Sequence, residues 1–276
     1  MRKILSLIII PILNTIRFFL KIIIDFLIYA LNIIKIHAIP KYEFPKPKIK
    51  KTINIFNDSQ NIRKVHDLFL EDEYKDCYNH FKKHFYTSIL VPERKNVWDY
   101  AIKKSLSNYE NENLYLEFGV FKGKSINYAA KKLVDIKIYG FDSFEGLKED
   151  WVGASSFAGR FSLNGKIPKL EPNVSVIKGW VQDTISKFLD ENKSKKINYV
   201  HFDLDTYNST KFVLEKIKPH LKNKCIIVFD ELYNYPAWRY GEYKALTEVL
   251  DEKEYKYICF HTEPYGSVAI EYNKVN

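Results

Sequence analysis

The spacing of apolar residues separates a regularly alternating carboxyl-terminal part from a strongly apolar amino-terminal part. From residue 113 onward, short apolar runs rich in β-branched and aromatic residues alternate with segments of helical period. The predicted strands are 113–120, 135–142, 173–180, 197–205 and 225–231, and the predicted helices are 124–134, 183–191, 209–221 and 241–252. This alternation predicts an α/β fold with a doubly wound, mostly parallel sheet. Two closely spaced strands at 255–263 and 266–273 predict a C-terminal antiparallel hairpin.

Residues 4–36 are overwhelmingly apolar and long enough to cross a bilayer. Polar residues interrupt this run mostly at intervals of three, four or seven, which places them on one stripe of a helix. These interruptions argue against a cleavable signal peptide. A spanning helix would have to pair or pack Arg17, Lys21 and Asp25, whereas a helix lying in the membrane interface accommodates the stripe directly. We therefore predict a membrane-associated helix over 1–39, and both orientations stay open.

The next segments lead to the main domain. Residues 40–51 form a basic, proline-containing linker whose lysines suit an anionic membrane surface. The positive-inside rule then predicts a membrane-associated protein with its catalytic domain in the cytoplasm. Two amphipathic helical segments follow within 58–109. We assign 52–89 to a helical cap and 90–276 to the main domain, and a homo-oligomer formed through the cap helices stays open.

Charge and cysteine content narrow the classes of function. Of the net charge of +9, residues 1–51 contribute +8 and the remainder contributes +1. A nearly neutral main domain lacks the basic face that binds phosphate backbones, so we expect no nucleic-acid substrate. The cysteines, Cys77, Cys225 and Cys259, form no CxxC pair. This argues against a disulfide framework or a zinc site and fits a reducing compartment.

The first strand of the alternating part leads into LEFGVFKGKS, which contains Glu117, Gly119, Gly123 and Ser125. Glycines let a loop approach a ligand closely, and the start of the next helix offers free N–H groups. The stretch matches neither GxGxxG nor GxxxxGK[ST], and an ordinary strand–helix turn explains it about equally well. The next strand, however, ends in Asp142, where an acid suits ribose hydroxyls. Loop and acid together indicate a nucleoside-bearing ligand.

Acidic residues also end two later strands, with Asp203 and Asp205 in HFDLDTYNST and Asp230 and Glu231 in VFDE. In the usual strand order these strands are neighbours about 4.8 Å apart, so their carboxylates converge. Crowded carboxylates repel unless a cation or proton intervenes, and an all-oxygen set favours Mg²⁺, Mn²⁺ or Ca²⁺. Asp203 is therefore a candidate metal ligand and Asp205 a candidate helix cap or proton acceptor. We expect His201 to be packed or hydrogen-bonded rather than catalytic.

Five motifs, LEFGVFKGKS, YGFDSFEGL, KGWVQDT, HFDLDTYNST and VFDELYNYPA, occur in this order. Their order and spacing resemble the macrocin O-methyltransferase-like family. Its members are class I, metal-dependent enzymes that transfer a methyl group from S-adenosylmethionine (SAM) to sugar hydroxyls. The resemblance covers about residues 90–275 and implies a Rossmann-like class I methyltransferase fold.

The resemblance also implies the roles of individual residues. Glu117, Gly119 and Gly123 would line the methionine end of SAM, and Asp142 and Ser143 would hold its ribose. Asp183 would lie near the adenine, although a helix N-cap explains it equally well. The full cofactor-binding set predicted is Glu117, Gly119, Gly123, Ser125, Asp142, Ser143 and Asp183. The predicted metal ligands are Asp203, Asp230 and Glu231.

The implied reaction is SAM-dependent methylation of a sugar hydroxyl that is chelated by a divalent cation, for which we name Mg²⁺. Asp203 or Asp205 would be the catalytic proton acceptor; the lysine base of related catechol-type enzymes is replaced here by Thr206. The apolar leader favours a membrane-bound acceptor, such as a lipid-linked saccharide or glycan of a surface polysaccharide. A soluble sugar nucleotide or small-molecule acceptor, or a non-catalytic SAM-binding scaffold protein at the membrane, is the alternative.

Overall fold

The computed structural model describes residue 20 and residues 65–275. The predicted membrane helix over 1–39 (apart from residue 20), the linker over 40–51 and the first part of the predicted cap therefore lie outside the described residues. Within the part of the chain that is described, no helix has the length and apolarity needed to cross a membrane. The described residues from 65 onward belong to one compact unit.

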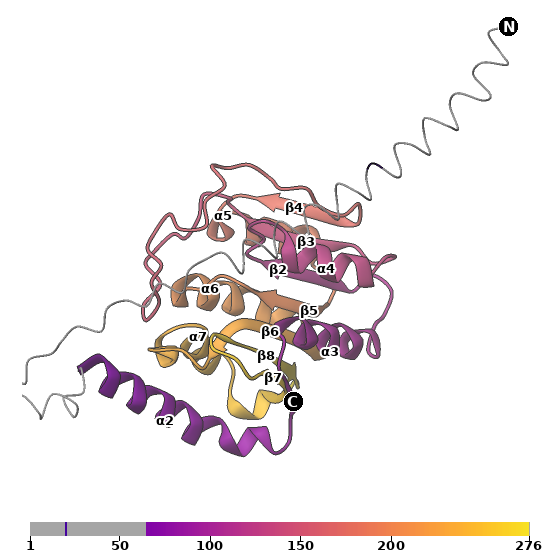
Figure 1. The fold of residues 1–276 in the computed structure, drawn as a ribbon. Helices are drawn as coiled ribbons and strands as arrows, with labels where there is room; N and C mark the ends of the chain where they lie inside the picture. The colour runs from indigo at the N-terminus through magenta and orange to yellow at the C-terminus, as the bar shows by residue number, and fades with distance from the viewer. Residues whose placement is uncertain (1–19, 21–64, 276) are drawn as a thin grey trace, which may run out of the picture. The chain divides into compact units, whose positions relative to one another are not determined.

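The centre of this unit is a single sheet of eight strands (Figure 1). The strands are β1 (Ile89–Val91), β2 (Leu114–Phe118), β3 (Ile138–Asp142), β4 (Val174–Lys178), β5 (Ile197–Phe202), β6 (Leu221–Tyr233), β7 (Tyr255–His261) and β8 (Gly266–Tyr272). Their order is β1-β7-β8-β6-β5-β2-β3-β4. Among these described strands, only β8 is antiparallel to its neighbours, β6 and β7. The predicted doubly wound, mostly parallel sheet with an antiparallel hairpin is confirmed.

Helices cover both faces of the sheet (Figure 1). They are α2 (Val65–Phe85), α3 (Arg94–Leu106), α4 (Lys124–Lys132), α5 (Val181–Glu191), α6 (Tyr207–Ile217) and α7 (Glu242–Val249). Apolar residues of α3 and α4 pack on one face, whereas those of α5, α6, α7 and α2 pack on the other. Each helix presents one apolar stripe because its buried residues recur at helical spacing, as Val181, Ile185, Phe188 and Leu189 do in α5.

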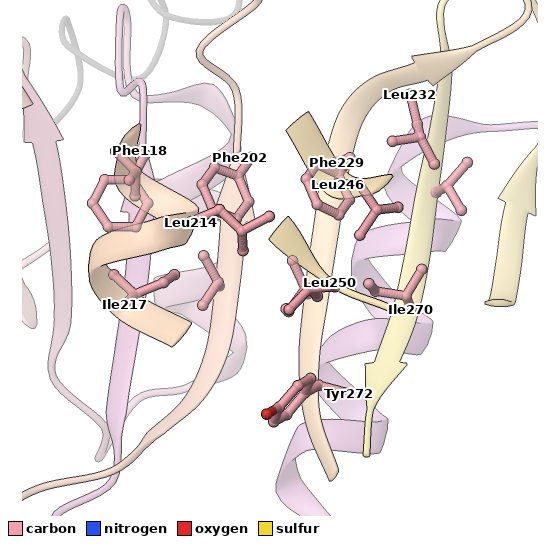
Figure 2. Close-up of a cluster of buried hydrophobic side chains, with 14 of the residues drawn as sticks. Phe118, Phe202, Leu214, Ile217, Phe229, Leu232, Leu246, Leu250, Ile270 and Tyr272 are labelled. Carbon is pink, nitrogen blue, oxygen red and sulfur yellow. The ribbon is translucent and has the colours of Figure 1, made fainter. Parts of the chain in front are cut away.

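Stacked phenylalanines fix the register of the central strands. Phe202 of β5 lies between Phe118 of β2 and Phe229 of β6, with ring centroids 5.5 Å and 5.1 Å away. Figure 2 shows these rings beside Leu214 and Ile217 of α6. Because the three parallel strands are in register here, the residues that follow them all emerge at the same edge of the sheet.

Helix α2 and strand β1 are integral to this unit. Phe81 of α2 is fully buried and makes edge contacts with the rings of Tyr233, Tyr257 and Phe260. Strand β1 forms one edge of the sheet and straddles residue 90, where we place the start of the main domain. The described part of the assigned cap therefore contributes the core side chain of Phe81 and the first residue of β1.

Gly119 allows two backbones to meet at the carboxyl edge of the sheet. Its φ is +89°, and a Cβ built on it would lie 1.8 Å from the carbonyl oxygen of Asp203. The same junction is held by hydrogen bonds from Gly119 N to Phe141 O and from Asp203 N to Phe118 O, at 2.9 and 2.8 Å. No side chain fits between these strands, so glycine is required by packing as well as by conformation.

We expect Gly119→Ala to lower the free energy of unfolding by about 2–4 kcal/mol, because it combines an unfavourable φ with a backbone clash. Urea unfolding of the variant and the parent protein measures the change. Gly159→Ala is the matched control, since Gly159 has a φ of +82° but no atom within 4 Å of the position that a Cβ would take. It should cost only about 1 kcal/mol. Equal losses for both variants would show that close approach at Gly119 is unimportant.

Candidate active site

A cavity of about 300 Å³ lies at the carboxyl edge of the sheet. It is lined by residues that follow β2, β3, β4 and β5, by two residues of β6 and two of α3, and by the segment between β3 and β4. Of the predicted site residues, its lining includes Gly119, Ser125, Asp142, Ser143, Asp203, Asp205, Asp230 and Glu231. In an open α/β sheet this edge is where ligands bind.

Asp142 organises the end of the cavity next to β2 and β3. One carboxylate oxygen accepts hydrogen bonds from the backbone N–H groups of Val120 and Phe121 at 2.8 and 2.7 Å. The other accepts from the N–H of Phe144 at 2.6 Å. The same side chain that ends β3 thus holds the loop after β2, which leaves its carboxylate at the cavity wall. Ser143 is buried beside it.

Glu117, Gly123 and Asp183 are not among the residues that line the cavity. Glu117 is fully buried behind the lining and accepts a 2.7 Å hydrogen bond from Ser125 Oγ. Gly123 begins α4 with a φ of +77°, and a Cβ there would lie 2.6 Å from Leu170. Asp183 is exposed in the first turn of α5. The structure thus brings four of the seven predicted cofactor residues to the cavity wall.

Three carboxylates from β6 and the residues after β5 converge at the cavity wall. Asp203, Asp205 and Glu231 each place one oxygen within 4.8 Å of the others. Asp205 reaches this position with a φ of +61°, a left-handed conformation that aspartate tolerates. Glu231 Oε2 is buried and receives no hydrogen bond from the described residues. This all-oxygen group includes two of the three predicted metal ligands and the predicted proton acceptor.

Asp230 shares Arg94 with its neighbour Glu231 and has two further partners of its own. It forms an ion pair with Arg94, accepts a hydrogen bond from Trp98 Nε1 at 3.3 Å, and lies 3.2 Å from His201 Nε2. Both carboxylate oxygens of Asp230 therefore have partners within the protein. Burial opposes its ionisation, but His201 and Arg94 outweigh burial and lower the pKa of Asp230 to about 2.

The remaining acids of the cluster resist ionisation. Burial, followed by the charges of Asp230 and Asp205, raises the pKa of Asp203 well above its ordinary value. Burial and Asp230 raise the pKa of Asp205 to about 7. Burial and the surrounding aspartates also raise the pKa of Glu231. The cluster therefore holds protons at neutral pH unless a cation is bound in their place.

We expect the metal-free protein to lose stability as the pH rises from about 4 to about 7. The folded state keeps the Asp205 proton, with a pKa of about 7, that the unfolded chain releases near 3.8. This proton therefore stabilises the folded state fully below the unfolded pKa, and the stabilisation is lost as the pH rises through the folded pKa. It amounts to at most roughly 4 kcal/mol. Thermal unfolding at pH 5 and about 7.5, with and without Mg²⁺, measures this. Mg²⁺ should stabilise more at the higher pH.

Asp205→Asn is the control for this pH dependence, because asparagine also tolerates a left-handed backbone but cannot ionise. Its stability should change less between the two pH values than that of the parent protein. Equal Mg²⁺ stabilisation at both pH values would contradict the assignment.

Arg94 is a site residue that the sequence reading missed. It begins α3, and Nη1 contacts Asp230 and lies 2.7 Å from Glu231 Oε1, while Nη2 donates to the carbonyl of Tyr265 at 2.7 Å. Burial lowers the pKa of Arg94, but Asp230 and Glu231 raise it further, so the guanidinium stays charged. One signal existed in the sequence: a basic residue at a helix start opposes the helix dipole.

Aromatic side chains form the wall beside the acids. Trp151, from the segment between β3 and β4, lines the cavity, and its ring makes an edge contact with Tyr265 at 5.6 Å. Tyr265 stacks on Tyr235 with ring centroids 5.4 Å apart. Phe121 and Phe161, in edge contact at 5.5 Å, also line the cavity. Trp151 and Phe161 lie in a segment without regular period, which explains why sequence pattern did not select them.

Comparisons with known proteins agree with this geometry. Residues 116–232 match a family model described as a methyltransferase domain. No curated protein matches the sequence. The chain has a fold similar to CalS11, calicheamicin methyltransferase, with 24% identity, coverage of 74% of this chain and 86% of that chain, and a TM-score of 0.54.

Two further solved structures are more distant. The apo structure of CalS11, described as a TDP-rhamnose 3'-O-methyltransferase, is 22% identical and covers 83% of this chain and 89% of its own, with a TM-score of 0.48. The O-methyltransferase NovP is 19% identical and covers 66% and 79%, with a TM-score of 0.46.

The match to a methyltransferase domain confirms the predicted methyltransferase activity. SAM is the methyl donor of this class. Asp142 and Ser125, in the first turn of α4, both line the cavity. The chain is therefore a SAM-dependent methyltransferase with a Rossmann-like fold.

Proposed function

We propose that this enzyme is an O-methyltransferase that transfers the methyl group of SAM to a sugar hydroxyl. One observation carries the proposal: Asp142 and the converging carboxylates of Asp203, Asp205 and Glu231 line one cavity. A donor held at one end would face an acceptor oxygen held at the other. Carboxylates at that point suit a hydroxyl, which must lose a proton as it is methylated.

The donor set also fits a divalent cation such as Mg²⁺. Asp203, Asp205 and Glu231 supply only oxygen atoms, and the buried Oε2 of Glu231 lacks a hydrogen-bond donor among the described residues. Asp230, the remaining predicted ligand, would orient the group through Arg94 instead of binding the ion through a free oxygen. When bound, the ion would supply Lewis-acid chemistry that lowers the pKa of an acceptor hydroxyl.

The transfer itself would be a direct displacement. The acceptor oxygen forms a bond to the methyl carbon while the bond from that carbon to the sulfonium sulfur breaks, which leaves S-adenosylhomocysteine. The hydroxyl proton passes to the ionised carboxylate of Asp203 or Asp205, both of which line the cavity. The aromatic wall of Trp151 and Phe161 would pack on the apolar face of a sugar ring.

A turnover assay with SAM and candidate sugar acceptors tests this function. Methyl transfer should require Mg²⁺ and stop in EDTA. Calorimetry with SAM alone separates the enzyme from a non-catalytic SAM-binding scaffold, which would bind SAM without turnover. Undiminished turnover in EDTA would remove the metal from the proposal.

The acceptor we propose is a lipid-linked saccharide or glycan at the cytoplasmic face of a membrane. The support is the apolar run over 4–36 and the basic linker over 40–51, which would concentrate the domain near such an acceptor. Deleting residues 1–40 should therefore reduce methylation of acceptor in membranes. If the shortened protein works equally well without membranes, a soluble sugar nucleotide becomes the better candidate.

A further inference from the structure

A chain of buried polar side chains passes behind the cavity from one end to the other. Ser125 Oγ donates to Glu117 Oε1 at 2.7 Å, and Glu117 Oε2 lies 3.2 Å from Nδ1 of His201. His201 Nε2 lies 3.2 Å from Oδ1 of Asp230, which in turn pairs with Arg94. The chain therefore links the first turn of α4 to β2, β5, β6 and the first turn of α3.

His201 is the central member of this chain. Its side chain is 1% exposed, and each ring nitrogen faces a carboxylate oxygen. A carboxylate only accepts hydrogen bonds, so both ring nitrogens must donate, and the imidazole is doubly protonated. One cation thus satisfies two buried anions that come from different strands, which confirms that His201 is hydrogen-bonded rather than merely packed.

The two ends of this chain of polar side chains line the cavity, whereas its middle members do not. Ser125, Asp230 and Arg94 line the cavity, but Glu117 and His201 lie behind it. Ser125 belongs to the helix start on the SAM side. Arg94 contacts Glu231, which belongs to the carboxylate group on the acceptor side. The two ends are therefore connected through buried, hydrogen-bonded side chains in a low-dielectric environment.

We infer that His201 is a positioning residue that couples SAM binding at the α4 end to cation binding at the carboxylate end. This inference rests on the proposed function, because it takes Mg²⁺ as a ligand of the carboxylate group. Binding of SAM fixes Ser125 and the start of α4. The chain of hydrogen-bonded side chains then fixes Asp230, Arg94 and Glu231 in the arrangement that receives the ion. Linkage requires the reciprocal effect, in which Mg²⁺ tightens SAM binding by the same factor.

The competing explanation is that His201 only neutralises two buried acids and stabilises the fold. Both explanations predict that its replacement destabilises the protein. Only coupling predicts that the ratio of SAM affinities with and without Mg²⁺ changes. That ratio is the informative quantity because a general loss of stability affects both affinities alike.

Two conservative variants each cut one side of the chain. The amide nitrogen of Gln reaches roughly as far as Nε2 of histidine. His201→Gln therefore keeps a donor for Asp230 and loses the contact with Glu117. The amide nitrogen of Asn reaches roughly as far as Nδ1. His201→Asn therefore keeps the contact with Glu117 and loses the contact with Asp230. Ser125→Ala removes the α4 end without altering any buried charge, and it keeps the test available if the His201 variants do not fold. His84→Gln is the control, because His84 packs on Tyr257 away from the cavity.

Calorimetric titration of the full-length protein in detergent with SAM, in the presence and absence of Mg²⁺, measures the coupling. We expect Mg²⁺ to tighten SAM binding roughly tenfold in the parent protein and in His84→Gln, within the usual range for coupled sites. The factor should fall below about twofold in His201→Gln, His201→Asn and Ser125→Ala. Retained coupling in these variants overturns the inference about His201 and leaves the proposed function standing. If the parent protein does not bind Mg²⁺ at all, the metal part of the proposed function fails and the inference fails with it.

Discussion

Asp203→Asn is expected to reduce methyl transfer by at least about 1,000-fold while changing the dissociation constant of SAM less than about threefold. Asparagine can neither accept the hydroxyl proton nor supply an anionic ligand, and general-base loss alone is worth about 10²–10⁴-fold. SAM binding should survive because the backbone of Asp203, which meets Gly119, is unchanged. Steady-state kinetics and calorimetry measure the two effects separately.

The same substitution should raise the melting temperature of the metal-free protein. Burial, followed by the charges of Asp230 and Asp205, disfavours the ionised form of Asp203, so a permanently neutral side chain of the same shape removes that cost. Asp190→Asn, on the exposed surface of α5, is the matched control and should change neither quantity. A fall in both activity and stability would instead mean that Asp203 supports the fold. Substantial remaining turnover would leave Asp205 as the proton acceptor.

Asp142→Asn is expected to weaken SAM binding by at least about 30-fold. The parent carboxylate accepts from three backbone N–H groups, including those of Val120 and Phe121 in the cofactor loop. An amide nitrogen in place of one oxygen turns acceptor into donor, so it loses at least one charged hydrogen bond and opposes another N–H. Equilibrium binding of SAM measures the loss, which corresponds to about 2 kcal/mol.

Asp183→Asn provides the comparison for this effect. Asp183 is exposed and does not line the cavity, so its replacement should change SAM affinity less than about threefold. A large effect there would show that the first turn of α5 contacts the adenine after all, as the family resemblance implies. Equal effects at both positions would contradict the special role given to Asp142.

The sequence pattern was sufficient for the parallel part of the fold, because strand and helix periods were regular from β2 onward. It also located the carboxyl-edge acids, since Asp142, Asp203 and Asp230 each follow or end an apolar strand. It did not predict that Arg94 and His201 pair with the carboxylate of Asp230. Side-chain direction at a strand end depends on neighbouring elements, and Arg94 lies 136 residues away in sequence. Pairings of that kind leave no local pattern.

The role of glycines was only partly predictable for a similar reason. A glycine after a strand indicates that something approaches closely, but not which group approaches. At Gly119 the close neighbour is the backbone of Asp203, and at Gly123 it is Leu170. Both contacts are between segments distant in sequence, so only the folded structure identifies them.

The three-residue strand β1 has a practical consequence for solubility. It pairs with β7 through Ile89, Leu90 and Val91, opposite Cys259, Phe260 and His261. A protein shortened to begin at α3 would lack β1 and leave the N–H and C=O groups along that edge of β7 unpaired. Such an edge is a template for pairing with other chains and hence for aggregation. The short segment between α2 and α3 thus protects the edge of β7 from association with other copies of the chain.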